Sequence, residues 1–222
     1  MFRYLLWRLR FELCNLKRLL GPGERRVEYL AFGANLSDAI LRERRIKPLA
    51  ARPFTLRDYG LRFDHPAPWA NCGYASAEPA AGETLHGYLY TLHERDAARM
   101  DYYEVVPVLN RYRRTVVEQD GETIFFYQTN RSTPNLRPTA EYLGFIVQGL
   151  SDHPDVSEDY LERIRAIAPG EPGRLVSTYH RDKPGDRRGL AAKLVDGYDR
   201  LSLRLFIGVL YPFSLTDPFI RH

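Results

Sequence analysis

Apolar and polar positions alternate over residues 27–31 in a run of residue types that favour strands. The strand pattern stops at a turn of small residues, 32–35. Residues 39–42 then follow a helical pattern, with Ser37 or Asp38 in the N-cap position. The sequence therefore predicts a strand, a tight turn and a helix in direct succession.

The middle of the chain carries further strand and helix patterns. Gln119-Asp120-Gly121 predicts a hairpin. Strands without strict βαβ alternation, with helices around them, predict an α+β fold, a small mixed β-barrel or sheet surrounded by helices. The strands are expected over residues 54–63, 73–78, 83–92, 111–118 and 122–129, and the helices over residues 94–103, 139–150 and 157–166.

Helical patterns at both ends predict extensions to this fold. Leucines recur at three- and four-residue spacing over residues 1–20, and Gly21-Pro22-Gly23 ends the segment. Residues 190–211 are a second helical candidate, after a charged loop over 181–189. The expected organisation is a basic amphipathic helical extension over 1–26, a central domain over 27–170, and a C-terminal loop and helical extension over 171–222.

The net charge of +4 is concentrated at the N-terminus. Residues 1–20 contain five basic residues and one acidic residue, which gives 5 − 1 = +4, so the remaining chain is close to neutral. A protein that binds nucleic acid would be expected to spread a basic face over its folded body. We therefore predict no nucleic-acid partner.

The basic helix 1–20 is expected to pack its leucine face on the body of the protein or to self-associate with a second copy. The alternative is binding to an anionic membrane surface. Charged residues interrupt the apolar stretch, which argues against a secretory signal and a membrane span. Two cysteines, Cys14 and Cys72, are too few for a disulfide framework, although a single bridge stays open. The expected location is cytoplasmic, with a membrane-peripheral one as the alternative.

The turn at 32–35 is a candidate anion site. Gly33 allows the backbone to approach a ligand closely, and Asn35 adds an amide with donors and an acceptor. A turn that leads into a helix N-terminus presents backbone N–H groups, which can hold a carboxylate or an oxyanion. The alternative is an ordinary turn between a strand and a helix.

Glu104 is the candidate acid or base. It follows a predicted helix and stands among Tyr102, Tyr103, Val105 and Val106. A carboxyl group in apolar company is suited to exchange a proton near neutral pH. The alternative is a solvated glutamate at a helix end. Neither candidate depends on a metal, and the six histidines show no ligand spacing, so no metal and no cofactor are expected.

Several segments together resemble the γ-glutamylcyclotransferase family. Tyr-Leu-Ala-Phe-Gly-Ala-Asn-Leu at 29–36 is similar to the family's Tyr-Gly-Ser-Asn-Leu turn, and 100–104 resembles the segment that ends in its catalytic glutamate. The strands between these motifs and the later tyrosine-bearing segments are also similar. The resemblance covers about residues 27–167, and it implies the fold of that family.

The resemblance also implies roles for individual residues. Glu104 would be the catalytic acid/base of a cyclisation that releases 5-oxoproline and a free amine from a small-molecule γ-glutamyl substrate. The substrate-binding residues would be Leu30, Ala31, Phe32, Gly33, Ala34, Asn35, Tyr127 and Tyr142, with Tyr112 in a comparable position.

The chain departs from the family pattern at three positions. Phe32 replaces a tyrosine, Ala34 a serine and Val105 a glycine, so glutathione, γ-glutamyl amino acids and γ-glutamylamines all stay open as substrates. One alternative is a non-catalytic or membrane-peripheral binding protein that retains the fold. Others are a cyclase or acyl transferase for a larger γ-glutamyl metabolite, and Cys72 as a nucleophile, for which the sequence places no histidine partner.

Overall fold

The computed structural model describes residues 25–44, 46–67, 69–104, 112–130, 132–153 and 155–174. The helices predicted over 1–20 and 190–211, and the loop over 181–189, lie outside the described residues and stay predictions. No helix within the described ranges is long and apolar enough to cross a membrane.

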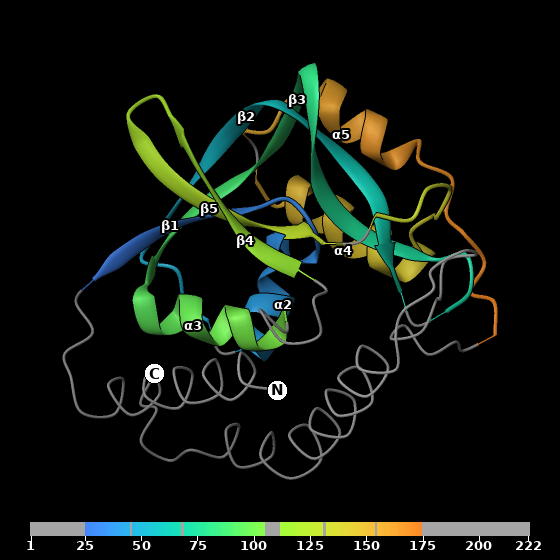
Figure 1. Ribbon diagram of the computed structural model, residues 1–222, viewed down its shortest axis with the longest axis horizontal. Coiled ribbons are helices and arrows are strands. Elements are labelled where there is room, and N and C mark those ends of the chain that lie inside the picture. The colour runs from blue at the N-terminus through green and yellow to red at the C-terminus, as the bar shows by residue number, and fades with distance from the viewer. Residues whose placement is uncertain are drawn as a thin grey trace, which may run out of the picture. The chain divides into compact units, whose positions relative to one another are not determined.

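A five-stranded mixed sheet forms the centre of the fold, in the order β2-β3-β1-β5-β4 (Figure 1). Neighbouring strands are antiparallel except β1 and β5, which run parallel. Of the two expected forms, the described strands make an open sheet and no closed barrel. The strands are β1 (Arg26–Ala31), β2 (Ala50–Pro66), β3 (Gly73–His93), β4 (Tyr112–Gln119) and β5 (Glu122–Thr129).

The strands predicted at 73–78 and 83–92 are parts of one long strand, β3, so the prediction of two separate strands is wrong. Pairing with β2 continues on both sides of a register shift between Arg57 and Tyr59. Asp58 adopts a positive φ there, and its Oδ1 accepts a hydrogen bond of 2.8 Å from the Gly82 N–H. The residues between the two predicted strands are an irregularity within the pairing of β2 with β3.

The predicted hairpin is confirmed. Gln119 pairs with Glu122, and the two residues between them have φ values of 56° at Asp120 and 80° at Gly121. Positive φ at both positions is the requirement of the tight turn that matches the twist of paired strands.

Within the described residues, five helical segments accompany the sheet: η1 (Ala34–Leu36), α2 (Asp38–Glu43), α3 (Glu94–Tyr103), α4 (Ala140–Ser151) and α5 (Glu158–Arg165). The predicted helices that fall in these residues are confirmed to within one or two residues at their ends. Thr139 caps α4 by accepting a hydrogen bond from the Tyr142 N–H, whereas Ser37 and Ser157 occupy N-cap positions without a side-chain bond.

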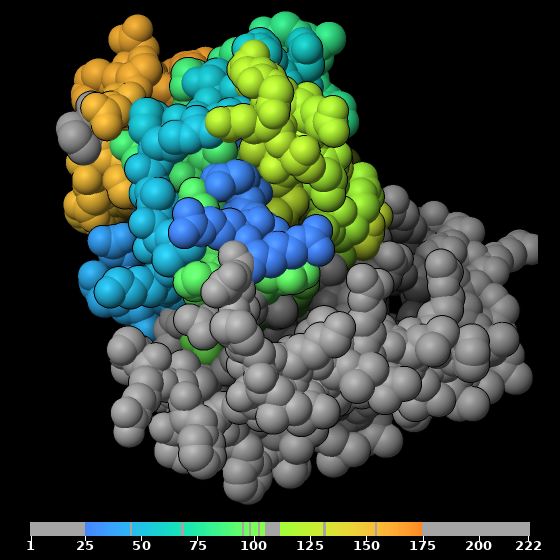
Figure 2. All heavy atoms as spheres, turned by 90° about the vertical axis from the view of Figure 1, so that its left-hand side faces the viewer, coloured from blue at the N-terminus to red at the C-terminus, as the bar shows by residue number. Residues whose placement is uncertain are grey.

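The core lies around the central strands, because residues 29–31 of β1 and 87–90 of β3 are buried in succession, so both faces are covered there. Leu30, Ala31 and Leu92 have no exposed surface, and Ile146 of α4 packs in the same cluster. Figure 2 shows one side of the described body, with β1 in blue between β2 in cyan and the β4–β5 hairpin in yellow-green. This packing fixes the end of β1, where the candidate site begins.

Candidate active site

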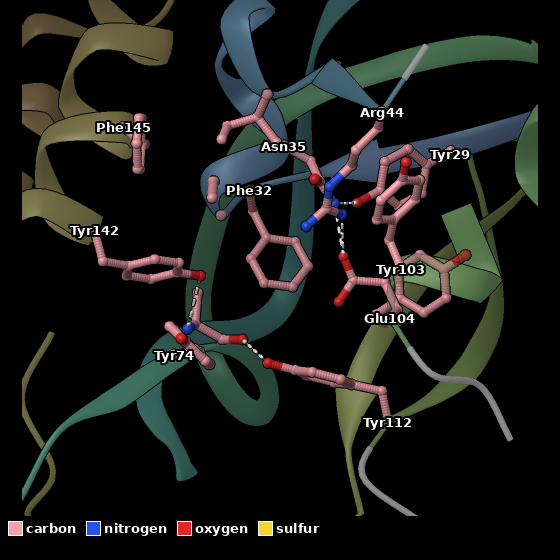
Figure 3. A pocket seen from close by; sticks show the side chains of 15 residues that line it. Tyr29, Phe32, Asn35, Arg44, Tyr74, Tyr103, Glu104, Tyr112, Tyr142 and Phe145 are labelled. Atoms are coloured by element: carbon pink, nitrogen blue, oxygen red, sulfur yellow. Dashed lines mark hydrogen bonds and ion pairs between the residues drawn. The ribbon is translucent and has the colours of Figure 1, made fainter. Parts of the chain in front are cut away.

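A cavity of about 340 Å³ opens where β1 ends (Figure 3). Its wall combines three polar side chains, those of Asn35, Arg44 and Glu104, with many aromatic ones. The lining residues come from strands and helices that are far apart in the sequence: Tyr29, Phe32, Gly33, Ala34, Asn35, Ile40, Arg44, Tyr74, Ala75, Tyr103, Glu104, Tyr112, Tyr127, Tyr142 and Phe145.

The turn after β1 forms one wall of the cavity. The Leu36 N–H donates to the Gly33 carbonyl at 3.0 Å, which closes a short 3₁₀ turn. The first N–H groups of such a turn have no partner within it, so they can serve a ligand. A Cβ added at Gly33 would lie 3.1 Å from the Tyr142 hydroxyl and 3.2 Å from the Ala75 Cβ. The close approach therefore favours glycine at this position.

The Glu104 carboxylate enters the cavity from the end of α3. The Glu104 N–H donates to the Met100 carbonyl at 2.9 Å, which continues the last turn of the helix. Oε1 accepts hydrogen bonds from Arg44 Nη1 at 2.7 Å and from Asn35 Nδ2 at 3.2 Å. The side chain is only 15% exposed. Asn35 therefore connects the turn at 32–35 with Glu104, the candidate acid/base.

Arg44 is a buried cation at the end of α2. Burial alone would lower the pKa of its guanidinium, but the adjacent Glu104 carboxylate outweighs burial and raises that pKa. The guanidinium carbon lies 5.0 Å from the centre of the Tyr103 ring. A planar cation on an aromatic face, paired with a carboxylate, is a well-satisfied arrangement for a buried arginine.

Three tyrosines of the cavity are neutral hydrogen-bonding groups. Burial raises the pKa of Tyr29, Tyr127 and Tyr142 above the ordinary value of a phenol. The Tyr29 hydroxyl accepts from Asn35 at 2.7 Å, and the Tyr142 hydroxyl accepts from the Ala75 N–H at 3.1 Å. The first contact joins the turn to β1, and the second joins α4 to β3.

Tyr127 belongs to a second network beneath the cavity. Its hydroxyl donates to Asp101 Oδ1 at 2.7 Å, and Arg114 Nε donates to the same oxygen at 2.6 Å. Asp101 stands one helical turn before Glu104, so this network ties α3 to the β4–β5 hairpin. On the far side of the cavity, the Tyr112 hydroxyl donates to the Ala75 carbonyl at 3.4 Å.

Most residues predicted for the site line this one cavity. They are Glu104, Phe32, Gly33, Ala34, Asn35, Tyr112, Tyr127 and Tyr142. Leu30 and Ala31 are not among the lining residues, because both are wholly buried in the core. Cys72 also lies elsewhere, as a buried free thiol whose Sγ is 3.7 Å from the Glu171 carbonyl. Burial raises the pKa of that thiol, which disfavours the reactive thiolate.

Sequence reasoning missed several lining residues, among them Arg44, Tyr74 and Phe145. Arg44 carries no local signal, since it is one of several arginines around α2. Tyr29 stands in the quoted motif, and its place in the alternating strand pattern could have indicated that it shares a face with the turn.

The fold brings a largely buried carboxylate and a backbone turn into the wall of one cavity. Residues 29–143 match the family model described as gamma-glutamyl cyclotransferase, AIG2-like. The chain belongs to this family. Family membership supports a γ-glutamyl cyclotransferase-like enzyme that acts on small γ-glutamyl molecules.

Solved structures share the fold at low sequence identity. An uncharacterized protein from Homo sapiens matches with a TM-score of 0.56 and 22% identity, over 70% of this chain and 96% of that one. A gamma-glutamyl cyclotransferase matches with a TM-score of 0.54 and 19% identity, over the same shares of the two chains. YkqA from Bacillus subtilis matches with a TM-score of 0.54 and 18% identity, over 69% of this chain and 60% of that one. No curated protein sequence gives a significant match.

Proposed function

We propose that the protein is a γ-glutamyl cyclotransferase that converts a γ-glutamyl amine or γ-glutamyl amino acid into 5-oxoproline and the free amine, with Glu104 as general acid/base. One observation carries the proposal. The Glu104 carboxylate is largely buried in a cavity whose wall also includes the turn that contains Gly33. A base and a set of backbone donors therefore share one small compartment.

The reaction requires little beyond proximity and two proton transfers. Glu104 accepts one proton from the substrate α-ammonium group, and the resulting amine attacks the γ-carbonyl carbon. The new N–C bond closes a five-membered ring, Glu104 returns this proton to the leaving nitrogen, and the bond to that nitrogen breaks. The ring nitrogen loses its second proton to Glu104, which passes it to the departing amine, so the products are 5-oxoproline with a neutral lactam N–H and the amine as its ammonium ion. Holding the γ-glutamyl chain folded supplies proximity, which is worth roughly 7–11 kcal/mol at best.

The turn supplies the electrostatic part of the reaction. Backbone N–H groups at residues 33–35 would hold the substrate carboxylate or the oxyanion that forms during attack. Losing one such donor typically costs a factor of about 10²–10³ in rate. Ala34 lacks the hydroxyl of the family's serine but keeps its backbone N–H, from which the Tyr142 hydroxyl already accepts a hydrogen bond and which a bound substrate would have to share.

The first prediction concerns Glu104→Gln. Glutamine is nearly isosteric and cannot accept the ammonium proton, so turnover should fall by about 10²–10⁴, the usual contribution of a general acid/base. The measurement is 5-oxoproline release by mass spectrometry over a panel of glutathione, γ-glutamyl amino acids and γ-glutamylamines. The matched control is Glu118→Gln, because Glu118 is exposed on β4. The proposal would be wrong if wild type released no 5-oxoproline from any compound of the panel. It would also be wrong if Glu104→Gln kept full activity.

A further inference from the structure

Two donors converge on the same oxygen of Glu104. Arg44 Nη1 lies 2.7 Å from Oε1, and Asn35 Nδ2 lies 3.2 Å from it. In Figure 3 the other carboxylate oxygen of Glu104 points away from Arg44 and toward the cavity. The two oxygens of one carboxylate are therefore in different environments, and only one of them is directed at the space that a substrate would occupy.

Arg44 is itself held firmly. Its guanidinium packs on the Tyr103 ring at 5.0 Å, and Nη1 also approaches the Met100 sulfur at 3.5 Å. Its side chain is 21% exposed. The ion pair joins the end of α2 to the end of α3, and both partners are largely shielded from water. An opposite charge is felt more strongly under such shielding than on the surface.

The other groups that surround Glu104 cannot replace this charge. Asp101, on the preceding turn of α3, is engaged by Arg114 and adds negative potential at Glu104. Among the described residues, Arg44 is the cation in contact with the Glu104 carboxylate. The remaining titratable groups that line the cavity from the neighbouring elements are phenols: Tyr29, Tyr74, Tyr103, Tyr112, Tyr127 and Tyr142.

We propose that Arg44 is a positioning residue, which holds the Glu104 side chain through Oε1 and so leaves Oε2 as the oxygen that exchanges the proton with the substrate. The catalytic role of Glu104 rests on the proposed function. The ion pair and its effect on Glu104 do not, so the two can be tested separately.

The direct test is a pH titration of the Glu104 side-chain carboxyl carbon by NMR in full-length protein, with the signal assigned by its loss in Glu104→Gln. In Arg44→Gln the chemical-shift transition should occur at higher pH than in wild type, because removing the cation favours the protonated acid. Arg44→Lys retains a positive charge, so its transition should occur at a pH between those of wild type and Arg44→Gln. It also provides a second variant if the glutamine protein does not fold.

The control for the titration is Arg42→Gln. Arg42 stands on the same helix, is 75% exposed and pairs with Asp38 on the surface. This variant should titrate like wild type. The inference would be overturned if the titration curve of Glu104 in Arg44→Gln coincided with that of wild type. It would also be overturned if Arg42→Gln moved the curve as far as Arg44→Gln does.

Kinetics separate this inference from the proposed function. With a substrate that wild type turns over, Arg44→Gln should lower kcat by roughly 10–100-fold, part of the total that general acid/base catalysis provides. KM should change little, and the acidic limb of the pH profile should move to higher pH. An active wild type with an unchanged pH profile in Arg44→Gln contradicts the inference and leaves the function standing. An inactive wild type contradicts the function, while the titration still decides the role of Arg44.

Discussion

The start of α4 depends on a single side-chain oxygen. Thr139 Oγ1 accepts a hydrogen bond of 3.1 Å from the Tyr142 N–H, and the Tyr142 hydroxyl reaches the Ala75 N–H at the same distance. One residue is therefore bonded through its backbone to the helix cap and through its side chain to β3. The cap orients a tyrosine of the cavity as well as stabilising a helix.

This arrangement predicts different costs for two N-cap substitutions. Thr139→Ala should destabilise the protein by about 1 kcal/mol, the usual cost of losing a capping oxygen. Ser157→Ala at the N-cap of α5 should change stability by less than about 0.5 kcal/mol, because Ser157 makes no capping bond. Urea unfolding of both variants measures the difference. Equal losses in the two would contradict the assignment of Thr139 as the cap.

Individual site residues were predictable where the residue type itself carries the chemistry. Gly33, Asn35 and Glu104 are recognisable because a conformational requirement, an amide or a lone acid among apolar neighbours is visible in the sequence. Arg44 was not, since its role depends on the end of α3, which is distant in the chain. No local pattern distinguishes it from the exposed Arg42 two positions earlier.

At the scale of the elements, α4 packs against η1 through a glycine. A Cβ added at Gly149 would lie 2.5 Å from the Leu36 Cβ and 2.6 Å from the Leu36 backbone carbon. Because η1 carries the turn that lines the cavity, this contact determines how closely the helix and the turn approach. Gly144, on the same helix, has open space around its Cα.

The two glycines should respond in opposite directions to alanine. Gly149→Ala introduces a methyl group into the backbone of Leu36 and should cost about 1–3 kcal/mol, the usual range for overpacking. Gly144→Ala should stabilise by about 0.5–1 kcal/mol, since alanine in a helix interior loses less conformational entropy than glycine on folding. Thermal and urea unfolding measure both. Stabilisation by both substitutions would mean that α4 can move away from η1 without cost.

The elements were predicted well where they carry their own local signals. The hairpin has Asp120-Gly121, and the helices have caps and a 3.6-residue period. The length of β3 could not be predicted in this way. Residues 79–83 lack alternation and include Pro79 and Gly82. Only Pro79 among them has a partner on β2, and the others belong to the strand because pairing with β2 resumes at Thr84. Likewise, the periodicity of single strands does not distinguish an open sheet from a barrel.

At the scale of the molecule, the cavity collects residues from nearly every described element around one end of β1. A ligand that fills it would contact β1, α3 and α4 together. Binding to the folded state alone should therefore stabilise the whole domain, by about 2.7 kcal/mol at a ligand concentration of 100 times Kd.

This stabilisation can be tested without turnover by using Glu104→Gln. Addition of a γ-glutamyl compound that wild type consumes should raise the Tm of the variant, because the site can fill but cannot react. The corresponding α-glutamyl isomer is the control, since it has the same composition and a different linkage. Equal shifts with both isomers would show that the cavity does not recognise the γ-linkage.

The parallel pairing of β1 with β5 has a consequence for synthesis on the ribosome. Tyr29 pairs with Tyr90 on one side and with Phe125 on the other, so the first strand emerges long before either neighbour exists. Contacts of such long sequence separation form slowly, and the unpaired segment is exposed to aggregation while it waits. The compartment around Glu104 can close only after translation has passed Phe145, so the nascent chain cannot bind a ligand there until this last part of the wall has been added.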